Sequence, residues 1–143
     1  MKRKIFFTLA VVALVAIAVS AISAADETVA IDGINFTVPD GFSEDASNGY
    51  VNEQREEAGL TYVVNGKLYE KGNTVMAIIV SDYGDYKVTD DVVKAVGGEA
   101  KTINGQSGYL KEDNGFKVFS FEKNDKLVAM STNDENIIGD FIA

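Results

Sequence analysis

The chain lacks cysteine, histidine and tryptophan, and its 143 residues include one proline. Without cysteine the protein has no disulfide framework, no thiolate metal site, no cysteine nucleophile and no haem attachment site. Without histidine it has no Ser-His-Asp triad, no imidazole metal ligand and no histidine-based pH switch. The most common nucleophile–base pairs are therefore excluded, and the length suits one domain better than two.

The N-terminus has the three parts of a secretory signal peptide. Residues 2–4 are all basic, the run from Ile5 to Val19 is apolar apart from Thr8, and small residues follow. Cleavage after Ala25 would place Ser23 and Ala25 at the two positions that the signal peptidase recognises. Cleavage after Ala24 is the alternative. We predict that residues 1–25 are a signal peptide and that the mature protein is exported, to the outer face of the membrane or beyond it.

A retained N-terminal membrane anchor is the other interpretation of residues 1–25. The apolar stretch from Ile5 to Ile22 has 18 residues, which is the lower limit for spanning a bilayer. The basic residues would then stay on the cytoplasmic side, and the protein would contact the membrane only through residues 5–22. Both interpretations place residues 26–143 outside the membrane as a single extracytoplasmic domain.

The domain that follows is strongly acidic. The whole chain has 22 acidic and 13 basic residues, and residues 1–25 contain three of the basic ones and no acidic one. Residues 26–143 therefore carry 22 acidic and 10 basic groups, a net charge of −12. Such a surface repels phosphate backbones, so we expect no nucleic-acid partner. Solubility outside the cell explains the charge, and an envelope or extracellular ligand remains the expected partner.

Apolar spacing and turn residues predict an α+β fold, in which two short helices pack on a mainly antiparallel sheet. Asp32-Gly33 suits the turn of a hairpin between residues 28–31 and 34–38, and Asn65-Gly66 suggests another hairpin between residues 60–64 and 67–70. The segment from Thr74 to Val80 is apolar on both faces, which predicts a central strand covered on two sides. Further strands are expected at residues 101–103, 108–112, 116–122 and 127–132, and that at 116–122 should have little solvent exposure.

Helix signals occur at two clear places and one weaker one. Thr89, two aspartates and Gly97 frame a helix with an inward stripe of valines. Asn133 or Asp134 caps a final helix that ends at Ile142 and buries Ile137, Ile138, Phe141 and Ile142. The segment from Tyr50 to Ala58 is compatible with a third short helix closed by Gly59.

Three patterns could carry chemistry, and each has a simpler explanation. Ser120 and Lys123 match an S-x-x-K string, but they lie on an expected strand, where their side chains would point to opposite faces. Asp82, Asp85, Asp90 and Asp91 could hold calcium, although their spacing matches no EF-hand. Tyr83 and Tyr86, beside Asp82 and Asp85, form the stretch most compatible with sugar binding. We assign no catalytic, cofactor-binding or metal-binding residue and expect no cofactor.

Asn35-Phe36-Thr37 is the one N-x-T sequon in the chain. Export would make it available for glycosylation, whereas a position inside a strand argues against efficient use. The Asn-Gly pairs that begin at Asn48, Asn65, Asn104 and Asn114 are turn formers.

Three segments carry a family resemblance: IDGINFTVPDGF, TDDVVKAVGGEAKTINGQSGYL and FKVFSFEKNDKLVAMSTNDENIIGDFI. Together they resemble a group of small exported proteins of methanogenic archaea that have no assigned activity. The order of elements also resembles the PsbP-like fold, through the turn at residues 38–42 and the strand turn at residues 104–109. This resemblance concerns architecture and implies a non-catalytic scaffold or binding module.

The sequence thus favours a non-enzymatic exported domain that binds another molecule or acts at the cell surface. The first alternative is a carboxylate-based hydrolase acting on cell-wall or environmental glycans, which needs two acids facing each other across a cleft. The second is a surface module stabilised by calcium.

Overall fold

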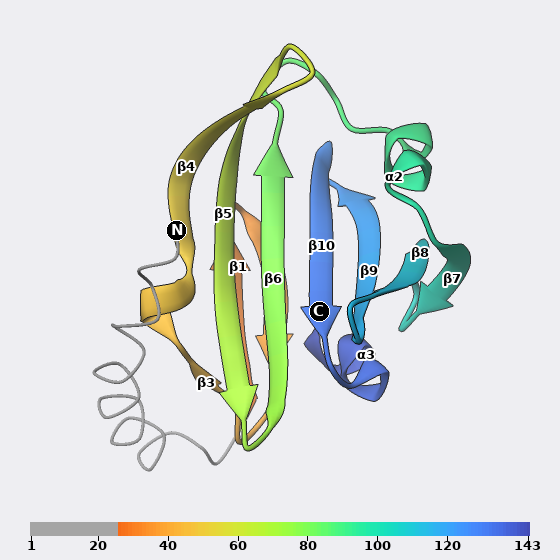
Figure 1. The fold of residues 1–143 in the computed structure, drawn as a ribbon. Helices are drawn as coiled ribbons and strands as arrows, with labels where there is room; N and C mark the ends of the chain where they lie inside the picture. Colours follow the sequence, from red (N-terminus) through yellow and green to blue (C-terminus); the bar gives the residue numbers. More distant parts are fainter. Residues whose placement is uncertain (1–25) are drawn as a thin grey trace.

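The computed structural model describes residues 26–143, in which eight strands form one antiparallel sheet and two more form a separate hairpin (Figure 1). The order in the sheet is β3-β5-β6-β10-β9-β8-β7, and β4 pairs with β5 beside β3. The elements are β1 (Glu27–Ile31), β2 (Ile34–Val38), β3 (Ser43–Glu44), β4 (Tyr50–Glu57), β5 (Leu60–Lys71), β6 (Thr74–Asp82), α2 (Asp90–Val96), β7 (Glu99–Ile103), β8 (Gln106–Asp113), β9 (Phe116–Lys123), β10 (Lys126–Thr132) and α3 (Ile138–Phe141). The predicted α+β class, with an antiparallel sheet and two short helices, is confirmed.

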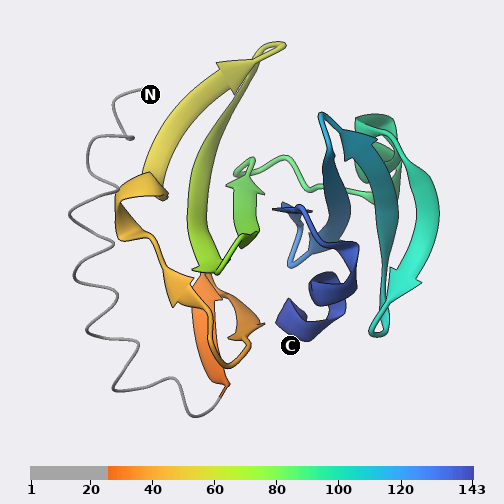
Figure 2. The same ribbon diagram turned by 60° about the horizontal axis from the view of Figure 1, so that its bottom comes forward.

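Two runs of consecutive antiparallel strands meet at the centre of the sheet. The chain runs through β4, β5 and β6, crosses over in α2, and returns through β7, β8, β9 and β10. Strand β10 then pairs with β6, with Met130 opposite Ile78. Helix α2 contacts β8 and β9 and therefore covers only that half of the sheet (Figure 2).

The hydrophobic core lies between the sheet and the β1–β2 hairpin. Alternate residues of β6 and β10 face it, and the hairpin and α3 pack against them. We call this side of the sheet the core face and the other side the open face. Because a side chain on a strand points to alternate sides, each strand contributes every second residue to the core. The most buried members are Ile34, Phe36, Met76, Ile78, Val80, Phe119, Val128, Met130, Ile138 and Phe141.

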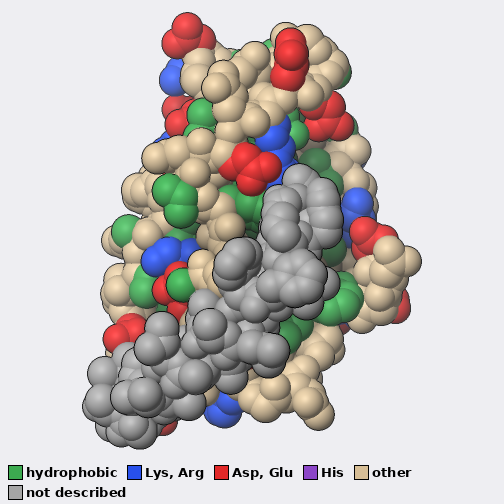
Figure 3. Space-filling view, turned by 60° about the vertical axis from the view of Figure 1, so that its left-hand side comes forward, with side chains coloured by type: hydrophobic (Ala, Val, Ile, Leu, Met, Phe, Trp, Pro, Cys, Tyr) green, Lys and Arg blue, Asp and Glu red, His purple; other side chains and the backbone are tan. Residues whose placement is uncertain are grey.

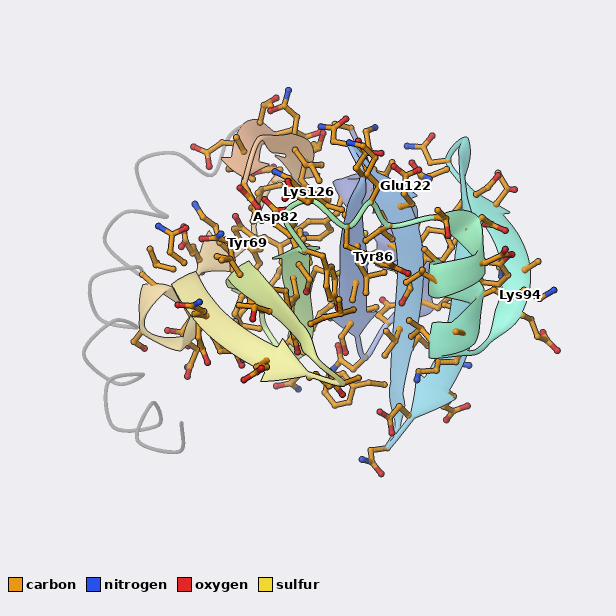
Figure 4. The ribbon with its side chains drawn as sticks, turned by 90° about the horizontal axis from the view of Figure 1, so that it is seen from above. Tyr69, Asp82, Tyr86, Lys94, Glu122 and Lys126 are labelled. Carbon is orange, nitrogen blue, oxygen red and sulfur yellow. The ribbon has the colours of Figure 1, made fainter. Side chains whose placement is uncertain are left out.

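Lys126 fastens the turn of the hairpin to the sheet. Its ammonium group donates to the carbonyl oxygen of Asp32 at 2.8 Å and lies 3.3 Å from the Asp32 carboxylate. It also lies 3.8 Å from the carboxylate of Asp82, and Figure 4 shows Asp82 and Lys126 next to each other. A partly buried lysine between two carboxylates holds the hairpin by charge as well as by apolar packing.

Several predicted turns and helix ends are confirmed. Asp32 and Gly33 have φ values of 49° and 82°, and Asn104-Gly105 and Asn114-Gly115 form the same kind of turn with both residues at positive φ. Helix α2 is followed by Gly97 with φ of 108°, although the Thr89 side chain makes no capping hydrogen bond. The C-terminal segment is a 3₁₀ turn (Glu135–Ile137) followed by α3, and the Asp134 carboxylate accepts a hydrogen bond from the Asn136 amide at 3.1 Å.

The helix predicted from Tyr50 to Ala58 is wrong, because this segment is the strand β4. Its side chains alternate between partly buried and exposed positions from Glu53 to Glu56, and it offers no apolar stripe that could hold a helix against the sheet. Ala58 and Gly59 form the turn into β5, with φ values of 54° and 82°.

The hairpin predicted around Asn65-Gly66 is also wrong, since both residues lie inside the continuous strand β5. Gly66 is required there by close packing and not by a turn. A Cβ atom at this position would lie 3.0 Å from the carbonyl oxygen of Ile78 and 3.1 Å from the Tyr50 ring. The Asn-Gly pattern therefore marks a tight contact in this strand.

Solvent exposure differs from prediction at two strands. Strand β6 is covered completely on its core face, but Val75, Ala77 and Ile79 on the open face are only partly buried. Phe116 at the start of β9 is 38% exposed, whereas Phe119 and Phe121 are buried as expected. The sequence shows that both faces of β6 are apolar. It does not show that α2 covers only half of the open face.

The predicted signal peptide or anchor, residues 1–25, lies outside the described residues. Within residues 26–143, no helix has the length and apolar character needed to cross a membrane.

Tyr69 gives a test of the core, because its hydroxyl group is buried and has no hydrogen-bond partner among the described residues. Burial, with smaller effects from Glu44 and Glu27, raises the pKa of this hydroxyl. The variant Tyr69→Phe keeps the ring and removes the unpaired polar atom, so we expect unchanged stability or a gain of up to about 1 kcal/mol in urea unfolding.

Tyr62→Phe is the matched control, because the Tyr62 hydroxyl donates to Glu57 at 3.2 Å. This variant should lose a few tenths of a kcal/mol, as expected for an exposed hydrogen bond. A loss larger than about 1 kcal/mol in Tyr69→Phe would mean that the buried hydroxyl is hydrogen-bonded in the folded protein.

Candidate functional site

The open face has an apolar centre that its neighbours do not fully cover. Strand register places Leu68, Ala77 and Ser131 in one row and Gly66, Ile79 and Ala129 in the next. Apart from Gly66, all of these residues are partly exposed. The side chains become small towards β10, where the first row ends in Ser131 and the second in Ala129. The result is a shallow floor with α2 over one half of the sheet and β4 along the other edge (Figures 1 and 2).

A groove of about 260 Å³ lies on this floor beside β4. We call it the Tyr50 groove; it is lined by Asn48, Tyr50, Gly66, Lys67, Leu68, Ala77 and Ile79. Its base is apolar. Asn48, from the 3₁₀ turn Ala46–Asn48 before β4, adds a polar side chain, and the Lys67 ammonium group lies 3.7 Å from the Glu44 carboxylate of β3. This combination of an apolar base with a few polar groups is typical of sites that bind small molecules or peptide side chains.

Irregular pairing between β4 and β5 positions Tyr50. Their register shifts between Tyr50 and Glu53, and Asn52 at the bulge has φ of 47°. The bulge is held by Asn65, whose side-chain oxygen accepts from the Asn52 amide at 2.9 Å. Because Gly66 has no side chain, the Tyr50 ring can lie directly against the strand. Val51 is 82% exposed at this bulge, so an apolar side chain reaches solvent next to the groove.

The groove has a charged neighbour on the same face. The Arg55 guanidinium lies 4.9 Å from the centre of the Tyr50 ring and 3.2 Å from a Glu53 carboxylate oxygen. The cation over the ring and the carboxylate beside it hold the tyrosine in place. In Figure 3, acidic and basic side chains are interspersed over the visible face of the described residues.

Three tyrosines cluster at the end of the open face, where the connection from β6 to α2 begins. Tyr62 and Tyr83 stack with ring centres 4.7 Å apart, and Tyr86 meets Tyr83 edge-on at 6.3 Å. Burial, followed by the neighbouring Tyr62, Glu57 and Tyr86, raises the pKa of Tyr83. Tyr86, labelled in Figure 4, is 45% exposed. Tyr83 and Tyr86 therefore lie on the open face, as part of a stacked cluster and not as a separate loop.

A second, polar cleft of about 490 Å³ lies where β7 and β8 meet the C-terminal segment. Lys101 donates to Glu135 at 2.7 Å, and Lys117 lies 3.4 Å from Glu112 and 3.9 Å from Glu135. The hydrogen bond from Lys101 lowers the pKa of Glu135, and both lysines add to this effect by their charge. An acid catalyst needs a raised pKa, so these pairs do not suit Glu135 to that role.

The structure separates the residues of the candidate motifs. Ser120 is buried on β9, and Lys123 lies at the exposed end of the same strand, which fits the strand interpretation of the S-x-x-K string. Asp82 accepts from the Gly84 amide at 2.9 Å, and Asp90 accepts from the Tyr109 hydroxyl at 2.9 Å. Within residues 26–143, no three acidic side chains gather in a way that could hold a metal ion.

Sequence reasoning missed the Tyr50 groove, because it placed Tyr50 on a helix and Gly66 in a turn. The usable signal was the alternation of Leu68, Gly66 and Val64 on one side of a single strand, opposite the lone Tyr50. Comparisons with protein-family models, curated proteins and solved structures found no match. The resemblances to exported archaeal proteins and to the PsbP-like fold stay predictions.

Proposed function

We propose that residues 26–143 form an exported, non-enzymatic domain that binds another molecule of the cell envelope or its surroundings through the Tyr50 groove. Support comes from one observation: Leu68, Ala77 and Ile79 stay partly exposed in a groove beside an ordered tyrosine ring. A partly covered apolar floor costs solvation free energy that a bound ligand would recover.

The surroundings of the groove limit the chemistry of this ligand. The domain carries a net charge of −12, counted over residues 26–143. A polyanion would be repelled over the whole approach, so the ligand is neutral or positively charged. An apolar base next to an aromatic ring favours a molecule with one apolar face, such as a sugar ring or an apolar peptide side chain.

Filling the groove with a charged side chain tests this proposal. We expect the exported protein to sediment with isolated envelopes of its own cells, and Ala77→Arg to weaken this association about tenfold or more. Ala95→Arg is the matched control, because it makes the same exchange on the exposed side of α2. It should bind as the unmodified protein does.

Equal binding by both variants would contradict the proposed site. Release of reducing sugar from the envelopes by the protein would instead support the glycan hydrolase.

A further inference from the structure

The sequon at Asn35 has a distinctive position in the fold. Asn35 lies in β2 between Ile34 and Phe36, which are each 1% exposed and point into the core. Because strand side chains alternate, the Asn35 side chain points the opposite way, and the residue is exposed. The strand therefore presents the amide to solvent.

The surface around Asn35 has space for a bulky group. Pairing of β1 with β2 places Thr28 opposite Thr37 and Ala30 opposite Asn35. This outer side of the hairpin consists of small, uncharged side chains, although 24% of the residues in the whole chain are charged. No long side chain of this set covers the amide.

Among the described residues, several asparagines use their side chains to hold the fold together, and Asn35 does not. The Asn65 side chain donates to that of Asn52, and Asn104 donates to the carbonyl oxygens of Gly139 and Ile142. The Asn133 side chain accepts from the Val75 amide near the start of β6. For the Asn35 amide, the described part of the chain provides no hydrogen-bond partner. Its nitrogen thus has no structural role that a covalent substituent would disturb.

We propose that Asn35 carries an N-linked glycan in the exported protein. The inference shares the premise of export with the proposed function and is independent of the Tyr50 groove. The donor is a lipid-linked oligosaccharide phosphate. The Asn35 Nδ2 atom forms a bond to sugar C1, and the bond from C1 to the phosphate oxygen breaks. The lipid phosphate leaves with the bonding electrons, and the amide loses one proton to a base of the transferase.

The position in β2 does not hide the sequon in the folded protein. β2 has one full partner, β1, and beyond the hairpin its only bridge among the described residues joins Phe36 to Ile142. A strand inside the eight-stranded sheet would be covered by neighbouring strands on both edges. In the two-stranded hairpin, β2 has one such neighbour, so its position in a strand is a weaker argument against glycosylation.

Mass spectrometry of the protein exported by its own cells tests the proposal. The tryptic peptide that ends at Arg55 contains Asn35, and its mass should exceed the sequence mass by whole sugar residues. Fragmentation should place the sugars on Asn35. Asn35→Gln should remove them. Thr37→Val should also remove them, since it keeps Asn35 and the shape of residue 37 but lacks the sequon hydroxyl.

Two controls make the outcome decisive. Thr37→Ser keeps the sequon and should retain the sugars, and Asn52→Gln changes an asparagine of the same peptide outside any sequon and should also retain them. An unmodified Asn35, in cells whose other exported sequons carry glycans, would overturn the proposal. So would sugars that persist in Asn35→Gln. Neither result bears on envelope binding by the Tyr50 groove.

Discussion

The variant Phe141→Ala should lose about 3–5 kcal/mol of unfolding free energy, the usual cost of removing a fully buried phenylalanine. Phe141 is 0% exposed although it belongs to a helix of one turn. Its ring meets Phe42 edge-on at 5.0 Å and lies 5.8 Å from Tyr69. The ring therefore joins the C-terminal segment, the strand β5 and the connection after the hairpin in one contact. Urea unfolding followed by circular dichroism measures the loss.

Phe116→Ala is the control for this variant, because Phe116 is 38% exposed at the start of β9. It should lose no more than about 1 kcal/mol. If both variants lost the same amount, the C-terminal segment would not be part of the core.

The variant Gly108→Ala should lose about 3 kcal/mol, at the upper end of the usual cost of overpacking. A Cβ atom on Gly108 would collide with the carbonyl oxygen of Ser120 and lie 3.0 Å from two carbons of the Phe119 ring. Ser120 is part of the β9 ladder, and Phe119 is completely buried, so neither can move cheaply. The strain should appear as a lower midpoint in thermal and urea unfolding.

Ser107→Ala provides the comparison, since Ser107 is the exposed neighbour of Gly108 in β8. Its effect should stay within about 0.5 kcal/mol. Full stability of Gly108→Ala would show that β8 can shift away from β9, which would contradict the close packing of these strands.

The sequence predicted the parts of the fold that short-range chemistry determines. Asp32-Gly33 and Asn114-Gly115 form turns because both residues of each pair tolerate positive φ. Gly97 ends α2 for the same local reason. The buried positions of Ile138 and Phe141 followed from apolar spacing and are confirmed.

The candidate site could not be predicted in the same way, because it depends on contacts between distant residues. Asn65-Gly66 is a good turn pair in isolation, but in β5 it makes room for the Tyr50 ring. β4 is rich in charged residues and has weak strand propensity, so its pairing with β5 decides its conformation. The half-covered open face depends on the lengths of α2 and its connections, which apolar spacing does not encode.

The bond between Lys126 and Asp32 spans 94 residues of sequence. A chain that passes through a secretion channel with its N-terminus first delivers β1 and β2 long before β10. The hairpin then has neither its lysine anchor nor the Phe36–Ile142 bridge until almost the last residue has emerged. If the protein is exported as we propose, its final assembly therefore waits until the end of translocation. In an exported chain, the sequon in β2 would reach a membrane-bound transferase during that interval, before the hairpin is anchored to the sheet.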